Sequence, residues 1–92
     1  MTNAIVLINV ESRQLQNVAQ SLVDIDEVSE VYSVGGRFDL VAVIRARTNE
    51  AISDIVTDQF PQIDGIRNTE TLIAFKVISK HDLERMFSIG AE

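Results

Sequence analysis

The spacing of apolar positions changes several times along this chain, and the changes divide it into predicted strands and helices. Residues 4–10 form an apolar run that predicts a first strand. Over residues 15–23 the apolar side chains recur at helical spacing, and Ser12 precedes them as the expected helix cap. After a turn at residues 24–27, residues 28–44 place two β-branched-rich runs around a glycine pair, which predicts a β-hairpin.

The second half of the chain repeats the helix and the strand. A second helix is expected to begin at Thr48 or Asn49 and to stop at Pro61, because proline disfavours the helical conformation in the residue before it. A last strand is expected over residues 66–78. Ser79, followed three residues later by a carboxylate, forms a capping box that predicts a short terminal helix.

The predicted order is strand, helix, strand, strand, helix, strand. Residues 25–28 (Ile-Asp-Glu-Val) and 63–66 (Ile-Asp-Gly-Ile) resemble each other, and each lies between a helix and a strand, which suggests a duplicated half. Order and repetition together predict an α+β, ferredoxin-like βαββαβ sandwich: a four-stranded antiparallel sheet with both helices on one face. At 92 residues, the chain is expected to be a single domain over residues 1–92.

Both faces of the predicted sheet are apolar, although two helices can cover only one of them. One parity of the strands gives Ile5, Leu7, Val41, Val43, Ile73, Phe75 and Val77. The other parity gives Ala4, Val6, Ile8, Phe38, Leu40, Ala42 and Ile44. Burying one such set is worth roughly 10–20 kcal/mol, as much as the whole stability of a typical domain. We therefore expect a homodimer packed sheet against sheet, rather than a terminal helix folded back over the bare face.

Composition and charge narrow the classes of function. The 46% apolar and 24% charged residues are typical of a globular domain. The net charge of −6, with scattered basic residues, argues against direct nucleic-acid binding. No apolar run approaches the roughly 20 residues that span a bilayer, and no secretory signal precedes the first strand, so we expect a cytoplasmic protein without a membrane partner.

Catalytic and metal-binding signals are weak. The only histidine is His81, and the chain has no cysteine, so we expect no catalytic residue, no metal site and no cofactor. A ligand-binding turn is the stronger signal. Gly35 and Gly36 leave backbone N–H groups open to a carboxylate, and Asp39 can accept a hydrogen bond from an ammonium group.

Two hydroxyls on the last predicted strand extend that signal. Thr69 and Thr71 share one face of the strand and could complete a site for an α-amino acid. The competing interpretation is an ordinary hairpin turn with a solvated aspartate and threonines that only occupy a sheet face.

Two segments resemble the effector-binding (RAM) domain of the Lrp/AsnC family of transcriptional regulators. Residues 34–40 (Val-Gly-Gly-Arg-Phe-Asp-Leu) are similar to its Gly-x-x-Asp loop, and residues 63–73 are similar to its "Gly-Val, Thr-x-Thr, aliphatic" segment. The resemblance implies a domain that dimerises through its sheets and often assembles as four dimers. It also implies that amino acids or related molecules bind at contacts between dimers, around the loop matched here by Gly35, Gly36, Arg37 and Asp39.

The family's regulators carry a helix-turn-helix domain before this one, whereas this sequence opens at the first strand and resembles the stand-alone form. The leading hypothesis is a non-enzymatic, oligomeric binding module for an amino acid or similar metabolite, able to form mixed oligomers with DNA-binding relatives. Two alternatives remain open at this point. One is a dimeric α/β-barrel enzyme of the monooxygenase or isomerase type, and the other is a purely structural oligomerisation module.

Overall fold

The computed structural model describes residues 1–80. His81 and almost all of the predicted terminal helix lie outside the described residues. The described elements are β1 (Thr2–Val10), α1 (Leu15–Val23), β2 (Val28–Ser33), β3 (Leu40–Ala46), α2 (Asn49–Asp54), the π-helical η1 (Ile55–Gln59), the 3-10 turn η2 (Phe60–Gln62) and β4 (Ile66–Ala74). This order confirms the predicted βαββαβ arrangement.

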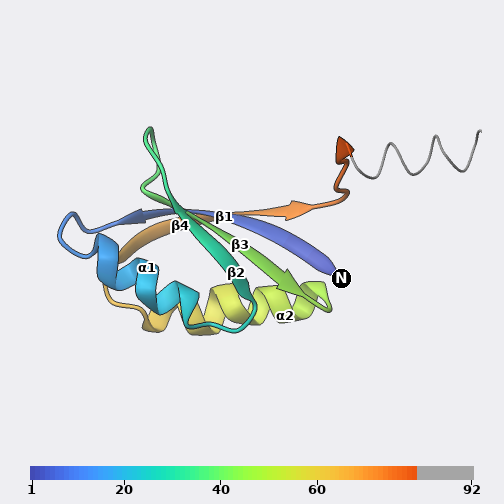
Figure 1. Cartoon of the computed structure of the whole chain (residues 1–92). Coiled ribbons are helices and arrows are strands. Elements are labelled where there is room, and N and C mark those ends of the chain that lie inside the picture. Colours follow the sequence, from blue (N-terminus) through green and yellow to red (C-terminus); the bar gives the residue numbers. More distant parts are fainter. Residues whose placement is uncertain (81–92) are drawn as a thin grey trace, which may run out of the picture.

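The four strands form one sheet in the order β2-β3-β1-β4, and every neighbouring pair is antiparallel. Within residues 1–80, the helices lie together on one side of the sheet, and the other side carries none (Figure 1). The predicted ferredoxin-like sandwich is therefore confirmed. The two central strands are β3 and β1, while β2 and β4 form the edges.

The face of the sheet that the helices cover, here the covered face, holds the core. Register pairs Ala4 with Ile44, Val6 with Ala42 and Ile8 with Leu40, and all six side chains are buried. The helical segments contribute Val18, Leu22, Ile52, Ile55 and Phe60 to this core. The helices thus cover the second parity set of the sequence prediction. Phe38 is the exception in that set, because it lies half-buried in the loop before β3.

The opposite face, here the open face, carries Ile5, Leu7, Tyr32, Val41, Val43 and Leu72. Ile73 was predicted on this face, and that prediction is wrong. Pairing to β1 sets Leu72 opposite Ile5 and Ile73 opposite Ala4, so Ile73 faces the helices. The sequence shows two adjacent apolar residues here, and only the pairing decides which one faces the helices.

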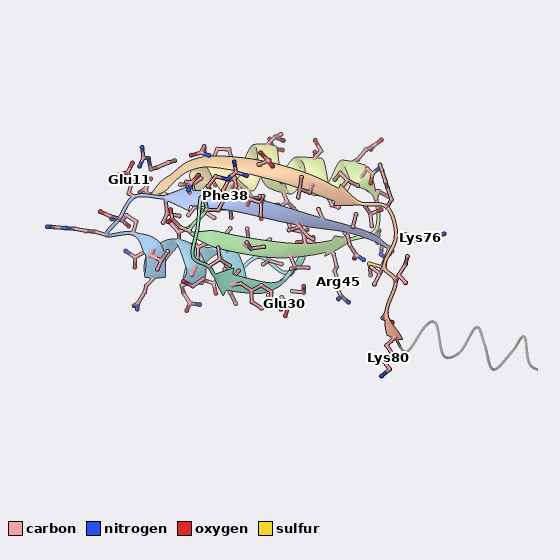
Figure 2. The ribbon with its side chains drawn as sticks, turned by 90° about the horizontal axis from the view of Figure 1, so that it is seen from above. Glu11, Glu30, Phe38, Arg45, Lys76 and Lys80 are labelled. Atoms are coloured by element: carbon pink, nitrogen blue, oxygen red, sulfur yellow. The ribbon has the colours of Figure 1, made fainter. Side chains whose placement is uncertain are left out.

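The end of β4 also differs from the sequence prediction. The strand stops at Ala74, so Phe75 and Val77 lie beyond it rather than on the open face. Phe75 is 98% exposed. Looking down on the open face, Lys76 and Lys80 lie past one end of the sheet and Glu11 lies at the other end (Figure 2).

The helix starts were predicted with mixed success. Thr48 caps α2, where its Oγ1 accepts a hydrogen bond from the backbone N–H of Ala51 at 3.1 Å. The helical segment continues through η1 and ends with η2, the turn that contains Pro61. Ser12, however, does not cap α1, because a turn carries the chain past it and the helix begins after Gln14.

Candidate functional site

The loop between β2 and β3 (residues 34–39, the β2–β3 loop) contains the predicted ligand-binding turn. It rises from the sheet on the side away from the helices (Figure 1). The Val34 N–H donates to the carbonyl of Asp39 at 3.0 Å and closes its base. Gly36 has φ +118°, a conformation that favours glycine. Among the described residues, no atom beyond the immediate chain neighbours lies within 4 Å of a Cβ built at Gly35 or Gly36. The backbone at the tip is therefore open to a ligand or another subunit, and Arg37 beside it is exposed.

Asp39 is half-buried and tied to the end of β1. Its backbone N–H donates to the carbonyl of Ile8 at 2.9 Å. Its carboxylate Oδ2 accepts a hydrogen bond from the Val10 N–H at 2.9 Å and lies 3.5 Å from the Asn9 amide nitrogen. Hydrogen bonds to an ionised group are stronger than neutral ones, so this carboxylate holds a defined position.

Asn9 links the β2–β3 loop to β4 across β1. Its side-chain Nδ2 donates to the carbonyl of Arg37 at 2.8 Å, and its Oδ1 accepts from Nδ2 of Asn68 at 3.1 Å. Three segments far apart in sequence are thereby joined at one end of the sheet. Sequence reasoning missed Asn9 and Asn68, although an asparagine that interrupts an apolar strand is a signal worth following.

A second feature adjoins Asp39, and we call it the end cleft. It encloses about 450 Å³ and is lined by Val10, Glu11, Ser12, Leu15, Asp39 and Arg67. The Nε of Arg67 lies 4.0 Å from Oε1 of Glu11, and both side chains are well exposed. The end cleft therefore brings one guanidinium and two carboxylates together. Sequence reasoning assigned Asp39 to the ligand site but assigned neither Glu11 nor Arg67 to it.

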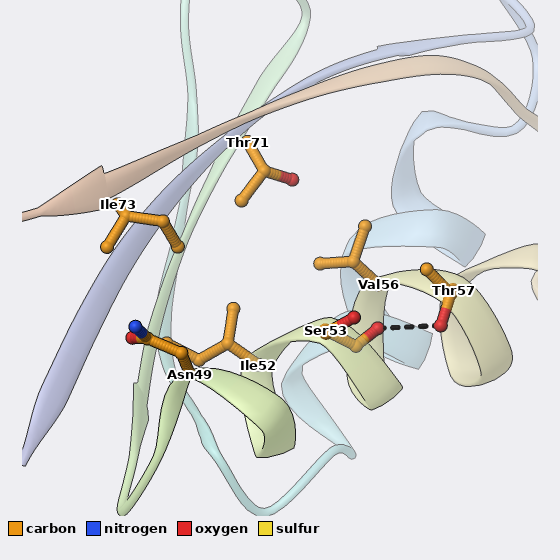
Figure 3. A pocket seen from close by; sticks show the side chains of 7 residues that line it. All are labelled: Asn49, Ile52, Ser53, Val56, Thr57, Thr71 and Ile73. Atoms are coloured by element: carbon orange, nitrogen blue, oxygen red, sulfur yellow. Dashed lines mark hydrogen bonds between the residues drawn. The ribbon is translucent and has the colours of Figure 1, made fainter.

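Thr69 and Thr71, the two threonines predicted to belong to the site, lie on the opposite face of the sheet from the β2–β3 loop (Figure 1). Pairing of Thr69 with Ile8 and of Thr71 with Val6 places both side chains on the covered face, so they share one face of β4 as predicted. Thr71 points toward the helices across a cleft (Figure 3). Thr69 lines a smaller hollow of about 130 Å³ beside η2. Within one chain, the structure does not bring these threonines together with the β2–β3 loop.

The cleft in Figure 3 lies between β4 and the segment formed by α2 and η1. It encloses about 390 Å³, and its lining residues are Asn49, Ile52, Ser53, Val56, Thr57, Thr71 and Ile73. The hydroxyl of Thr57 is engaged, because it donates to the backbone carbonyl of Ser53 at 2.7 Å. None of these lining side chains is ionisable near neutral pH, so they offer no general acid or base.

Other features of residues 1–80 bear on chemistry. The core of this described part contains no buried polar or charged side chain. Within the same residues, no group of three or more histidines and carboxylates is placed to hold a metal ion. No helix in this part of the chain is long and apolar enough to cross a membrane.

One pKa shift falls on the open face. Glu30 and Tyr32 both belong to β2, and the Glu30 carboxylate raises the pKa of the Tyr32 phenol above its ordinary value of 10.0 by hydrogen bonding and by its negative charge. This pair lies on edge strand β2, and neither residue lines the end cleft.

Fold and loop together define a regulatory ligand-binding domain of the RAM type. Residues 3–83 match the family model described as the Lrp/AsnC ligand binding domain, and the chain belongs to this family. It is 35% identical over 74 residues to the HTH-type transcriptional regulator FL11 of Pyrococcus furiosus, covering 80% of this chain and 48% of that regulator. The chain thus spans about half the length of the curated relatives it matches.

Solved structures agree on the fold. TTHA0845 from Thermus thermophilus superposes with a TM-score of 0.82 at 36% identity, covering 87% of this chain and 100% of that one. The transcriptional regulator NMB0573 of Neisseria meningitidis, solved as an L-Met complex, gives a TM-score of 0.78 over 85% of this chain and 52% of its own. At 18% identity this second likeness concerns the fold alone.

Proposed function

We propose that this domain is a non-enzymatic regulatory module that binds a free amino acid, or a closely related metabolite, and couples its occupancy to assembly. Membership of the Lrp/AsnC ligand binding domain family supports a regulatory effector domain. FL11 is an HTH-type transcriptional regulator, and the neisserial structural neighbour was solved with L-Met. The first fact favours transcription as the process that is regulated. The second shows that a protein with this fold binds an amino acid, the ligand class that we propose here.

The observation that carries the proposal is the arrangement of the β2–β3 loop. Its glycine tip presents open backbone, while Asp39 at its base presents a positioned carboxylate. A carboxylate acceptor suits the ammonium group of an amino acid, and open amides suit a carboxylate group or the surface of a neighbouring subunit. Arg37 adds an exposed cation beside the same tip.

The proposed assembly begins with a homodimer packed through the open faces, which would remove the exposed apolar surface of Ile5, Tyr32 and Leu72 from water. Four such dimers form the proposed higher oligomer. Thr69 and Thr71 lie on the covered face of edge strand β4, whereas the β2–β3 loop of the same chain rises from the open face. These threonines would therefore share a site only with the β2–β3 loop of a neighbouring subunit. A ligand held between subunits binds one assembly state better than another, and that differential affinity is what shifts the equilibrium.

The proposed partners follow from the same arrangement. We place the domain in the cytoplasm, in homo-oligomers and in mixed oligomers with DNA-binding members of its family. It would not contact DNA itself, because 14 acidic residues outnumber 8 scattered basic ones.

Calorimetry with a panel of free amino acids tests the ligand site. Asp39→Asn keeps an oxygen that can accept the Val10 N–H but removes the charge, so the affinity of the preferred amino acid should fall about tenfold or more. Asp26→Asn, in the turn before β2, is the matched control and should bind as the parent does. If no amino acid binds or thermally stabilises the parent, the proposal is wrong and a purely structural oligomerisation module is favoured.

A further inference from the structure

We propose that the end cleft reads the main-chain groups of a free amino acid, with Arg67 holding the α-carboxylate and Glu11 and Asp39 holding the α-ammonium. This inference rests on the proposed function, because it takes an amino acid as the ligand. It adds Glu11 and Arg67 to the site and leaves the glycine tip of the β2–β3 loop for a side chain or a neighbouring subunit. It also restricts the ligand to amino acids with both termini unblocked.

The charges in the end cleft match an amino acid in sign and spacing. Its volume of about 450 Å³ lies in the range of roughly 300–1,000 Å³ found for small-ligand sites. The carboxylate and the ammonium of an amino acid are neighbours on one carbon atom, and Arg67 and Glu11 are opposite charges 4.0 Å apart. A guanidinium binds a carboxylate through two parallel hydrogen bonds, which makes Arg67 a stronger partner than a backbone amide.

The pair formed by Glu11 and Arg67 is easily replaced by a ligand. The two side chains are 65% and 64% exposed, and an exposed pair at this distance contributes little to stability. An amino acid can give Arg67 a closer carboxylate and Glu11 a closer ammonium group, and the interaction lost is the weak pair between the two side chains. Asp39 is also able to receive the ammonium group, because within residues 1–80 the hydrogen bonds of its side chain fall on Oδ2 and leave Oδ1 to accept another.

The backbone around the end cleft is fixed before any ligand binds. The pairing of β1 with β4 shifts between Asn9 and Val10, and Arg67 is left without a partner in β1, as the extra residue of a β-bulge is. Bulges re-aim side chains and recur beside binding sites. The N–H of Glu11 donates to the carbonyl of Gly65 at 2.7 Å. Gly65 itself has φ +105°, and a Cβ there would lie 2.6 Å from Cβ of Gln14, so this corner is closely packed.

The test uses ligands that each lack one main-chain charge. L-methionine is the probe, with its methyl ester lacking the carboxylate and N-acetyl-L-methionine lacking the ammonium. The parent should bind L-methionine at least about tenfold more tightly than either derivative. Arg67→Met should lose about tenfold in affinity for L-methionine and leave the affinity for the ester unchanged, so its preference for the free acid disappears.

Matched variants separate direct contact from structural damage. Glu11→Gln should lose affinity for L-methionine but not for N-acetyl-L-methionine, and Arg67→Lys should restore part of the preference for the free acid. Arg47→Met, at the opposite end of β3, should bind all three compounds as the parent does. If Arg67→Met still prefers the free acid, this inference is wrong, while an effect of Asp39→Asn would leave the proposed function standing. If the parent binds no free amino acid, both are wrong.

Discussion

The two faces of the sheet are built from the same strands and nearly the same residue types, yet one face is buried and the other is partly exposed to solvent. On the covered face, Val6 and Ile8 are fully buried beneath the helices. On the open face of the same strand, Ile5 is 38% exposed, and Leu72 beside it is 46% exposed. Folding of the chain buries the covered face completely at these positions. The open face keeps exposed apolar surface, which an interaction with another molecule can bury.

A matched pair of substitutions on β1 gives the largest expected contrast. Ile8→Ala should lower the free energy of unfolding by about 2–5 kcal/mol, because it opens a cavity in a closed core. Ile5→Ala should cost about 1 kcal/mol or less in a dilute monomer, because more than a third of that side chain already meets water. Urea denaturation measures both. Equal costs at low protein concentration would show that the two faces are equally closed within a single chain.

A second pair, on β4, tests what covers the open face. Leu72→Asp should raise the dissociation constant of a sheet-to-sheet dimer by a factor on the order of 100 or more, because symmetry places the change twice in the interface. Ile73→Asp is the control, since its side chain lies on the covered face and should leave the dimer intact. Sedimentation equilibrium measures both. A parent chain that remains a 10.2 kDa monomer at high concentration would contradict the assembly.

The smallest expected effect concerns Tyr32, the only tyrosine in a chain without tryptophan. Glu30→Gln should lower its pKa toward the ordinary value of 10.0, because it removes the charge that raises it. The folded state holds this proton more tightly than the unfolded state. The resulting stabilisation is therefore present below the ordinary pKa and is lost as the pH rises through the folded pKa. Tyrosinate absorbance follows the titration, and identical curves for parent and variant would exclude this role for Glu30.

The sequence anticipated part of the candidate site. A glycine pair followed by an aspartate is local information, and the structure places these residues in one loop with Gly36 at a positive φ. The partners of Asp39 were not foreseeable in the same way. The Asn9 side chain forms hydrogen bonds with a backbone carbonyl 28 residues away and with an asparagine 59 residues away. Local sequence patterns do not reveal contacts between residues so far apart in the chain.

The sequence by itself determined the order of strands and helices as far as β4, where α2 is capped, and that two apolar sheet faces exist. These features depend on the spacing of apolar residues and on residues close in sequence, so local sequence patterns are enough to predict them. Only the tertiary structure decided that Leu72 rather than Ile73 belongs to the open face, and that Glu11, Asp39 and Arg67 share one cleft. The physical reason is strand register, because a shift of one residue in the pairing turns every side chain of a strand to the opposite face.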